Sequence, residues 1–393
     1  MATPLSIHNL MHGGWRSVLS VVGISIAIIL IFMQLGFLGA VTDTAVVFYD
    51  EMDFDLVASS PDYYTFVDSG RFSRHDLHAI ESHPAVQKVG PLHVCLGKWN
   101  YEAKEVQRGM LVMGIDPNTA SFKNPGVNEL RESLQRKSAM AVDRTSRPRF
   151  LGAENRKPFD ESQIGLQVEL NGVACQLVGL FDIGTGLAAD GAMIVNENLF
   201  KDLVPGYTND DVGIGLIRLK PGVDPEVARE SILQMFPKIS KSGDQRTIDV
   251  LTRNELESRE IAYWQWGTPI GFIFLAGSIV AFLVGAIIVY IVLSSDIAKQ
   301  MGEYATLKAM GYRNSFLFNT VMEQAFILAI ISYVCALGIS LVLYHVVGDL
   351  ANLPIMMTGF RLLLVLGSSL LMSFISASIA MQKLRQADPA DLF

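Results

Sequence analysis

Four long apolar stretches constrain the fold of this 393-residue chain more than any other feature of its sequence. A helix needs about 20 predominantly apolar residues to cross the roughly 30 Å of hydrocarbon in a bilayer. We therefore predict transmembrane helices at 17–42, 268–294, 315–348 and 362–382. The first stretch is longer than the apolar region of a secretory signal, about 7–15 residues, and no small-x-small cleavage site follows it. We interpret it as a retained membrane anchor.

The composition indicates a membrane protein with a substantial soluble part. Hydrophobic residues make up 50% of the chain and charged residues only 18%, whereas a soluble domain carries about 25% charged residues. The net charge of −8 argues against a nucleic-acid binder, which would present a basic surface.

Basic residues next to the apolar stretches predict the orientation in the membrane, because short cytoplasmic loops carry an excess of Lys and Arg. The segments 1–16, 295–314 and 383–393 hold Arg16, Lys299, Lys308, Arg313, Lys383 and Arg385, whereas the loop at 349–361 has only Arg361. We therefore predict a multi-pass membrane protein with both termini and the 295–314 segment in the cytoplasm. The region 43–260 and the short 349–361 loop would then lie outside the cytoplasm.

The 43–260 region predicts a mixed α/β domain. Its clearest signal is Asn171-Gly172 between two apolar runs, the preferred sequence of a two-residue hairpin turn. Further apolar runs that end at turn residues predict strands at 55–60, 109–116, 192–196, 212–220 and 247–251. The predicted fold class is therefore a membrane α-helical protein with four transmembrane helices and a large mixed α/β extracytoplasmic domain inserted between helices 1 and 2.

Capping patterns predict two short helices in this domain. Ser73 begins a helix whose buried face contains Leu77 and Ile80. Asp224-Pro225 begins another that extends to about Phe236, with proline at the first helical position.

A third capping pattern lies just before the second transmembrane stretch. Thr252-Arg-Asn-Glu255 has the spacing of a capping box. We expect its helix to run through Trp264 and Trp266 into the membrane without interruption, as a rigid connection that transmits displacement. The two tryptophans fit either an interfacial aromatic belt or packing within a buried stalk.

Several candidate sites for chemistry have a simpler structural interpretation. GTGLAA (184–189) has the dinucleotide-binding spacing, but that motif requires a following helix, and the sequence predicts a strand at 192–196, which favours a glycine-rich loop. His75, His78 and His83 could ligate a metal, yet no Cys or acidic residue lies at ligand spacing. A solvated helix face is favoured for these histidines.

Two further groups have the same ambiguity. Glu51, Asp53 and Asp55 could bind a cation, although alternating acids on a strand leaving the membrane are usually hydrated. Cys95 and Cys175 both fall in the soluble region and could pair, but free buried thiols are favoured, because cysteines at such low number behave mainly as small hydrophobes.

The sequence contains none of the HExxH, GxSxG and GxxxxGK[ST] motifs. Gly97-Lys98 lacks both the upstream glycine and the following Ser or Thr of a phosphate loop. We expect no catalytic residue, metal or cofactor in this chain, so another chain would supply the energy for any uphill transport.

The segment 299–314 is charged, predicts a helix and lies between two membrane stretches. Glu303, Leu307 and Met310 share one face, with Tyr304, Lys308 and Gly311 beside them, and Gly311 would end the helix. A merely solvated linker would not require apolar residues. Two interpretations remain: Leu307 and Met310 contact a partner protein, or they dip into the headgroup layer as an interfacial helix.

Glu323, followed by Gln324, lies at the start of the third transmembrane stretch. An ionisable residue within a membrane segment raises a functional hypothesis. Near a cytoplasmic end, however, Glu323 can reach water or cap a helix, and this structural interpretation is favoured.

The sequence resembles the FtsX/MacB-type permeases of ABC transporters and, within them, the DevC subgroup of the cyanobacterial DevBCA exporters. The general pattern includes NLMHGGWRSVLSVVGISIAI (9–28), which is similar to the N-terminal cytoplasmic helix and first span of that family. EYATLKAMGY (303–312) and LRQADPADLF (384–393) are the most specific matches; the others are FMQLGF (32–37), ADGAMIV (189–195), GLIRLKPGVDP (215–225) and TPIGFIF (268–274). The order MGE (301–303) departs from the wider family, and about 118–165 resembles nothing.

This resemblance implies a permease subunit of the cytoplasmic (inner) membrane that is not itself an enzyme, with the 43–260 domain and the 349–361 loop in the periplasm. It implies a homodimer bound to a DevA-like ATPase, which uses ATP and Mg²⁺, with a DevB-like membrane-fusion protein and a TolC-like outer-membrane channel. ATP-driven movement of the spans would be passed to the periplasmic domain, which expels a lipid-like or other periplasmic cargo. The coupling helix would comprise Lys299, Gln300, Gly302, Glu303, Tyr304, Leu307, Lys308, Met310 and Gly311, with Arg16 and Glu323 at span starts.

Two alternatives within the family stay open. An FtsX-like protein would signal across the membrane to a cell-wall hydrolase without transport. A lipoprotein-releasing permease would work as a heterodimer with a sister permease.

Overall fold

The computed structural model describes residues 15–100, 108–151, 157–184, 186–187, 189–236, 247–351, 353 and 355–386. The chain divides into two compact units. Thr42–Trp264 forms an α/β unit, whereas the described residues up to Val41 and from Gln265 onward form a helical unit. The α/β unit is therefore inserted after the first long helix and before the second, which confirms the predicted fold class.

The helical unit contains α2 (Trp15–Ala45), α9 (Pro269–Lys299), α10 (Met301–Ala309), α11 (Asn314–Ala351) and α12 (Gly359–Gln386). Within the described residues, four helical segments are long and apolar enough to cross a membrane: Val18–Ala45, Pro269–Lys299, Ser315–Leu350 and Gly359–Gln382. They overlap the four predicted transmembrane stretches.

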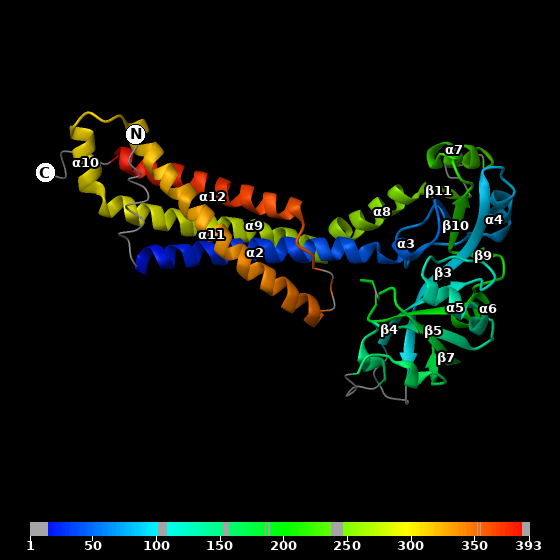
Figure 1. Ribbon diagram of the computed structural model, residues 1–393. Helices are drawn as coiled ribbons and strands as arrows, with labels where there is room; N and C mark the ends of the chain where they lie inside the picture. Colours follow the sequence, from blue (N-terminus) through cyan, green and yellow to red (C-terminus); the bar gives the residue numbers. More distant parts are fainter. Residues whose placement is uncertain are drawn as a thin grey trace. The chain divides into compact units, whose positions relative to one another are not determined.

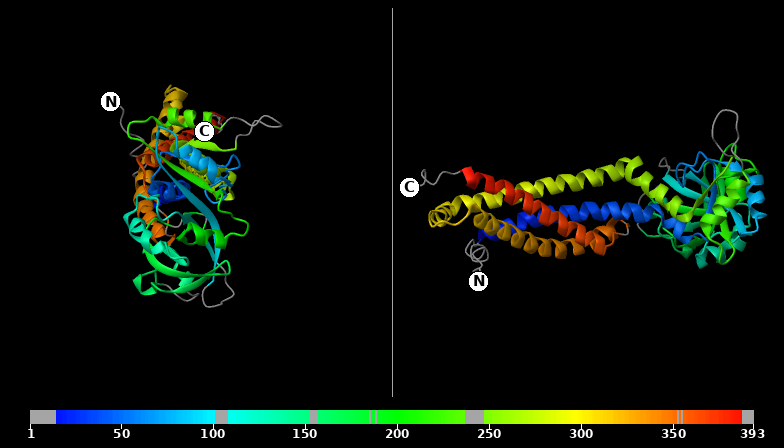
Figure 2. Two further views of the ribbon diagram at one scale, coloured as in Figure 1. Left: turned by 90° about the vertical axis from the view of Figure 1, so that its right-hand side faces the viewer. Right: turned by 90° about the horizontal axis from the view of Figure 1, so that it is seen from above.

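The four long helices share one apolar core. Helices α9, α11 and α12 pack against one another (Figure 1, Figure 2). Their buried side chains meet those of one face of α2, as Phe32 of α2, Leu293 of α9 and Met372 of α12 illustrate. Large apolar side chains also cover the outer faces; Phe360, for example, is 77% exposed. Exposed apolar surface of this extent is typical of helices that face lipid.

The described part of the α/β unit contains a nine-stranded mixed sheet with the order β11-β1-β10-β3-β4-β8-β5-β7-β6. Its strands, in chain order, are β1 (Leu56–Ser59), β3 (Val86–Asn100), β4 (Arg108–Ile115), β5 (Ala139–Asp143), β6 (Gln167–Leu170), β7 (Val173–Phe181), β8 (Ala192–Asn196), β10 (Ile214–Leu219) and β11 (Asp249–Thr252). The short strands β2 (Phe72–Ser73) and β9 (Asp211–Val212) pair separately.

The long strand β3 organises this sheet. Its first half pairs with β10 and its second half with β4, both antiparallel. At its end Trp99 lies opposite Leu170 of β6, so the strands from β3 through β4, β8, β5, β7 and β6 close on themselves. Closure removes the unpaired edges that an open sheet would expose in this part. Strands β10, β1 and β11 extend the first half of β3 as an open antiparallel sheet.

The central strands are buried on both faces. In β4, Met110 and Val112 belong to one apolar core, whereas Leu111 and Met113 belong to another, because successive side chains of a strand point to opposite faces. A strand covered on both sides has a continuous apolar sequence. This burial explains why the runs at 109–116 and 192–196 predicted strands, and β4 and β8 confirm both.

Six helices cover the sheet: α3 (Val47–Glu51), α4 (Arg74–Glu81), α5 (Pro125–Leu134), α6 (Glu197–Leu203), α7 (Pro225–Gln234) and α8 (Arg253–Ala262). Helix α4 lies on β3, α5 on β7, α6 on β4 and α7 on β11 (Figure 1). Two 3₁₀ turns, Pro148–Leu151 and Glu161–Gln163, complete the described elements.

The three predicted helix starts are confirmed. The Ser73 and Asp224 side chains accept hydrogen bonds from backbone N–H groups of the helices that follow them. At Thr252 both halves of the capping box form, since the Glu255 side chain also accepts from the Thr252 N–H. The predicted hairpin is confirmed as well: Asn171 has φ 48° and Gly172 φ 85°, and a type I′ turn requires positive φ at both central positions.

The prediction of a continuous helix from α8 into the second transmembrane stretch is wrong. Helix α8 ends at Ala262, a π-helical turn occupies Tyr263–Gly267, and Thr268 is extended with φ −116° and ψ 154°. The physical reason is Pro269, which disfavours a helical conformation of the residue before it but suits the first position of a new helix. Helix α9 accordingly begins at Pro269.

Close packing in β4 generates a stability prediction. A Cβ on Gly114 would lie 2.6 Å from Cβ of Phe200 in α6, whereas a Cβ on Gly109 in the same strand would meet nothing within 4 Å. Gly114→Ala should lower the free energy of unfolding by about 1–3 kcal/mol, the usual cost of overpacking. Gly109→Ala, the matched control, should be neutral or slightly stabilising because alanine has less unfolded-state entropy.

The measurement is the urea concentration at which Cys175, 1% exposed in the folded chain, becomes reactive to a thiol reagent in nanodiscs. Equal midpoints for the two variants would contradict the packing assignment at Gly114.

Candidate functional site

Helix α10 is a short helix with defined ends. It follows α9 after a break at Gln300, whose ψ of 9° departs from helical geometry. At its other end Gly311 has φ 92°, its N–H donates to the Lys308 carbonyl, and the Tyr312 N–H donates to the Leu307 carbonyl. This pair of bonds is the Schellman motif, which requires a left-handed residue and favours glycine. The predicted role of Gly311 as helix terminator is thus confirmed.

The predicted apolar face of α10 is only partly exposed. Met310 is 63% exposed and Glu303 is also exposed, but Leu307 is half-buried and packs against the core of the helical unit. Tyr304, expected beside that face, is 5% exposed and belongs to the same core. Because α10 packs on α9, one side of the helix is occupied by this chain, and among its described residues the exposed ones are the polar side, which includes Glu303 and Thr306, and the far end at Met310.

Three apolar side chains, Met310, Tyr312 and Phe316, gather at that far end, and we refer to them as the apolar tip. They are 63%, 46% and 38% exposed. The rings of Tyr312 and Phe316 pack with their centroids 4.9 Å apart. Figure 1 shows α10 at the end of the helical unit where α2 begins and α12 ends. Sequence reasoning missed the two aromatic residues, because both lie beyond the glycine that ends the helix.

Of the remaining predicted coupling residues, Lys299 ends α9, Gln300 and Gly302 lie at the start of α10, and Lys308 lies in its last turn. Gly302 and Lys299 are exposed, whereas Gln300 and Lys308 are half-buried. Arg16 lies in the first turn of α2, but its side chain is outside the described part of the chain. The roles assigned to these residues stay predictions.

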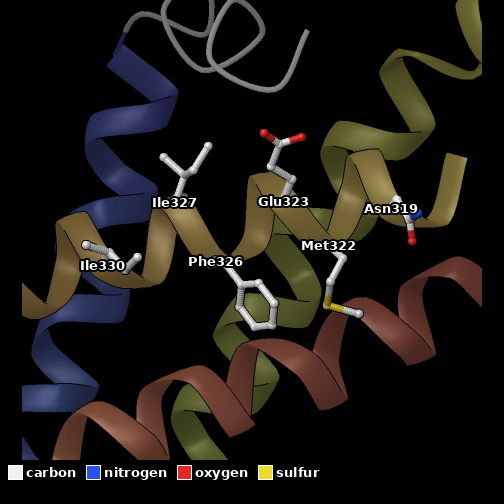
Figure 3. A pocket seen from close by; sticks show the side chains of 6 residues that line it. All are labelled: Asn319, Met322, Glu323, Phe326, Ile327 and Ile330. Atoms are coloured by element: carbon white, nitrogen blue, oxygen red, sulfur yellow. The ribbon is translucent and has the colours of Figure 1, made fainter. Parts of the chain in front are cut away.

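Glu323 is exposed on α11 and lines an open hollow of about 350 Å³ (Figure 3). All the lining residues come from α11: Asn319, Met322, Glu323, Phe326, Ile327 and Ile330. Figure 3 shows the Glu323 carboxylate pointing away from α12, toward which Met322 and Phe326 project. A hollow on one helix brings no second chemical group toward the carboxylate, so the geometry does not indicate catalysis.

The other sequence candidates are engaged in structural contacts. Rather than being hydrated, Asp53 bonds the Lys88 ammonium at 2.7 Å, and Asp55 bonds the Arg218 guanidinium at 2.9 Å. His83 bonds the Ser231 hydroxyl, and His78 lies 3.4 Å from Glu81. In the glycine-rich segment, Thr185 and Ala188 fall outside the described residues, and β8 follows where a dinucleotide site would need a helix. The thiols of Cys95 and Cys175 are free.

A buried acidic cluster, which we call the junction cluster, lies within the α/β unit and consists of Tyr49, Tyr63 and Glu260. Glu260 in α8 is only 3% exposed. Its carboxylate accepts from the Tyr49 hydroxyl at 3.2 Å, the Phe66 N–H at 3.0 Å and the Trp264 Nε1 at 3.0 Å. Tyr49 lies in α3, directly after α2, and Glu260 lies near the end of α8. The cluster therefore joins the first and last helices of the α/β unit.

Sequence reasoning missed Glu260, although a signal was present. Glu260 follows the buried Leu256 by four residues and precedes Trp264 by four, so an acid interrupts the apolar face of α8. Burial raises the pKa of the Glu260 carboxyl above its ordinary value of 4.5, against the lowering effect of its hydrogen-bond donors. Burial also raises the pKa of Tyr49 and Tyr63, so both phenols stay protonated and remain available as donors.

Comparison with known protein families decides what kind of chain this is. The MacB-like periplasmic core domain family matches residues 17–235, more than half of the chain, and the FtsX-like permease C-terminal family matches residues 275–389. The chain is a permease of the FtsX/MacB type. It is therefore a membrane subunit of the kind found in ABC transporters, and its α/β unit corresponds to the MacB-like core domain.

Solved structures give a weaker likeness to this permease. The periplasmic region of MacB from Actinobacillus actinomycetemcomitans has 10% identity and a TM-score of 0.36, and the match covers 52% of the permease and 90% of that chain. The extracellular domain of the ABC-type transporter YknZ from Gram-positive bacteria has 14% identity and a TM-score of 0.33, with coverages of 51% and 99%. A domain of a permease protein from Porphyromonas gingivalis has 17% identity and a TM-score of 0.35, with coverages of 57% and 97%. Comparison with curated proteins found no match.

The raised pKa of Glu260 generates a pH prediction for the permease. A carboxyl that binds its proton more tightly when folded contributes stability that is fully present below pH 4.5 and is lost as the pH rises through the folded pKa. Glu260→Gln is neutral at every pH and removes this contribution. The free energy of unfolding of the wild type, minus that of the variant, should therefore fall as the pH rises from about 4 to about 8.

Urea unfolding followed by tryptophan fluorescence in nanodiscs, repeated over this pH range, measures that difference. A difference that stays constant or grows with pH would show that Glu260 has no raised pKa in the folded permease.

Proposed function

We propose that this permease couples ATP hydrolysis by a separate ATPase subunit to movement of the α/β unit and thereby drives export. The single observation that carries the proposal is the apolar tip of α10. Met310 and Tyr312 are exposed at the end of α10 and just after it, and Phe316 is exposed in the first turn of α11. Glu303 and Arg313 in the same segment are charged and exposed. Aromatic residues and methionine are the apolar side chains that protein interfaces favour.

A partner protein explains the tip better than the lipid headgroup layer does. An interfacial helix presents one apolar face along its whole length. In α10 the exposed apolar groups are confined to the end, whereas Leu307 and Tyr304 turn inward to the core. The apolar tip presents two aromatic rings and a methionine, which are suited to enter a pocket on another subunit. Buried aromatic side chains of this kind supply most of the binding energy of protein interfaces.

In the proposed orientation, α10 and both termini face the cytoplasm, where the ATPase and its ATP are, and the α/β unit is periplasmic. The excess of basic residues in 1–16, 295–314 and 383–393 supports this orientation.

By resemblance to the DevC subgroup, the proposed complex contains two copies of this permease and two of a DevA-like ATPase. A DevB-like membrane-fusion protein would engage the α/β unit, and a TolC-like channel would complete the path across the outer membrane. A lipid-like or other periplasmic cargo is proposed on the same ground. The specific sequences EYATLKAMGY and LRQADPADLF support this assignment.

The tip generates a binding prediction. Met310→Asp combined with Tyr312→Asp should weaken binding of the ATPase subunit at least about a hundredfold, since loss of two interface anchors costs several kcal/mol. Both side chains are exposed, so the variant should insert and fold normally. Leu307→Asp is a poorer probe because it would place a charge against the core. Thr306→Ala, on the exposed side of α10, is the control.

Binding is measured by titrating the purified ATPase onto the permease in nanodiscs. Unchanged affinity of the double variant would refute docking at the tip.

The orientation generates a separate prediction for whole cells. A cysteine introduced at Val227, which is 67% exposed on α7, should react with a membrane-impermeant maleimide once the outer membrane is made permeable. A cysteine at Tyr312 should react only after the inner membrane is opened. The reverse pattern would place the α/β unit in the cytoplasm and remove the proposed function.

A further inference from the structure

The position of α10 depends on its contacts, because the helix is too short to be stable alone. It has 9 residues, and isolated helices below about 12–15 residues are marginal in water. The break at Gln300 also interrupts the helix between α9 and α10, although the Gln300 N–H donates to the Asp296 carbonyl and the Tyr304 N–H donates to the Gln300 carbonyl. Side-chain contacts with the long helices add to these two backbone bonds in fixing α10.

Tyr304 is the main such contact. It is the most buried side chain of α10, at 5% exposure, and it belongs to the same apolar core as Ile297 of α9 and Leu317 of α11. Its hydroxyl donates to the Gln300 Oε1 at 3.0 Å. Burial raises the pKa of Tyr304 to about 12, so the phenol remains a donor at neutral pH.

Gln300, which accepts the Tyr304 hydrogen bond, is linked through Asp296 to both neighbouring long helices. The Gln300 N–H donates to the backbone carbonyl of Asp296 at 3.1 Å, across the end of α9. The Asp296 carboxylate in turn accepts from the Nε2 of Gln324 in α11 at 3.3 Å. Gln324 is only 4% exposed, whereas Asp296 is half-buried. The bond is therefore partly shielded from water, and a charge-assisted bond in such surroundings is stronger than a fully exposed one.

We propose that Tyr304, together with Gln300, Asp296 and Gln324, is the joint that passes displacement of α10 to α9 and α11. The proposal rests on the proposed function, because it assumes that an ATPase subunit moves α10. Tyr304 is a positioning residue here. When the Tyr304 side chain is present, a displacement of the apolar tip also displaces α9 and α11. When it is absent, α10 rotates about the break at Gln300, and movement of the ATPase is not passed to α9 and α11.

Two tyrosines of the same segment allow a matched test, since Tyr304 is buried and Tyr312 is exposed. The complex with the ATPase is assembled in nanodiscs, and the nucleotide-dependent change in distance is measured between spin labels at Leu350→Cys and Val227→Cys. These positions are 82% and 67% exposed. The exposed Cys335 and the half-buried Cys95 are replaced by Ser, and the buried Cys175 remains.

The expected results separate binding from transmission. Tyr304→Ala should keep ATPase affinity within about twofold and keep ATP hydrolysis, but lose the distance change. Tyr312→Ala should lose affinity by at least about tenfold, with a normal distance change at saturating ATPase. Tyr304→Phe, which keeps the ring, should restore most of the change, and Gln324→Leu should reduce it without affecting affinity.

A full distance change in both Tyr304→Ala and Gln324→Leu would overturn the joint. So would a loss of ATPase affinity in Tyr304→Ala and Gln324→Leu as large as that in Tyr312→Ala, because both residues would then act in docking. Failure of the proposed function would look different. In that case the labelled permease with Tyr304, Tyr312 and Gln324 unchanged would not bind the ATPase, or would bind it without any nucleotide-dependent change in distance.

Discussion

Hydrocarbon excludes charge, and this exclusion decides where the helical unit forms its polar contacts. At one end of the long helices Asp296 of α9 bonds Gln324 of α11. At the other end the Arg361 guanidinium of α12 lies 5.8 Å from the ring of Tyr344 in α11, whose hydroxyl donates to the Phe32 carbonyl of α2. Between them contacts are mainly apolar, with isolated serine bonds to backbone carbonyls such as that of Ser376. These polar contacts of the helical unit are therefore concentrated towards the ends of its long helices, and its middle is packed mainly by apolar side chains.

The α/β unit obeys the related rule that a buried charge needs a partner. Asp55 bonds Arg218 and the Leu219 N–H, and it is thereby tied to β10. Glu260 is partnered by hydrogen-bond donors instead of a cation. The pKa of its carboxyl is raised because burial still disfavours the charged form. Replacing such a cluster by apolar residues would often stabilise a domain. The hydrogen bonds of Glu260 instead define the geometry at this position, because its carboxylate fixes Tyr49, the Phe66 N–H and Trp264 relative to one another.

The sequence allowed prediction of whatever depends on neighbouring residues. The Asn171-Gly172 hairpin, the capping box at Thr252 and the termination of α10 at Gly311 are local, because their hydrogen bonds span only a few residues. The partners of Glu260 and Asp55 could not be predicted, since Tyr49 lies 211 residues from Glu260 and Arg218 lies 163 residues from Asp55. The partial burial of the α10 face at Leu307 could not be predicted for the same reason. Helical spacing identifies residues that share a face, but only packing decides which face is turned inward.

The two chain segments that connect the units differ in backbone geometry. Helix α2 is helical from Trp15 to Ala45, whereas the second connection contains a π-helical turn and an extended Thr268. In the proposed exporter, a displacement that enters through α10 would reach α9, whose other end begins after this interruption. Because α9 shares an apolar core with α2, the uninterrupted α2 offers a second route. Helix α3 follows α2, and its Tyr49 bonds Glu260 of α8. The junction cluster therefore links the helices next to both connections inside the α/β unit.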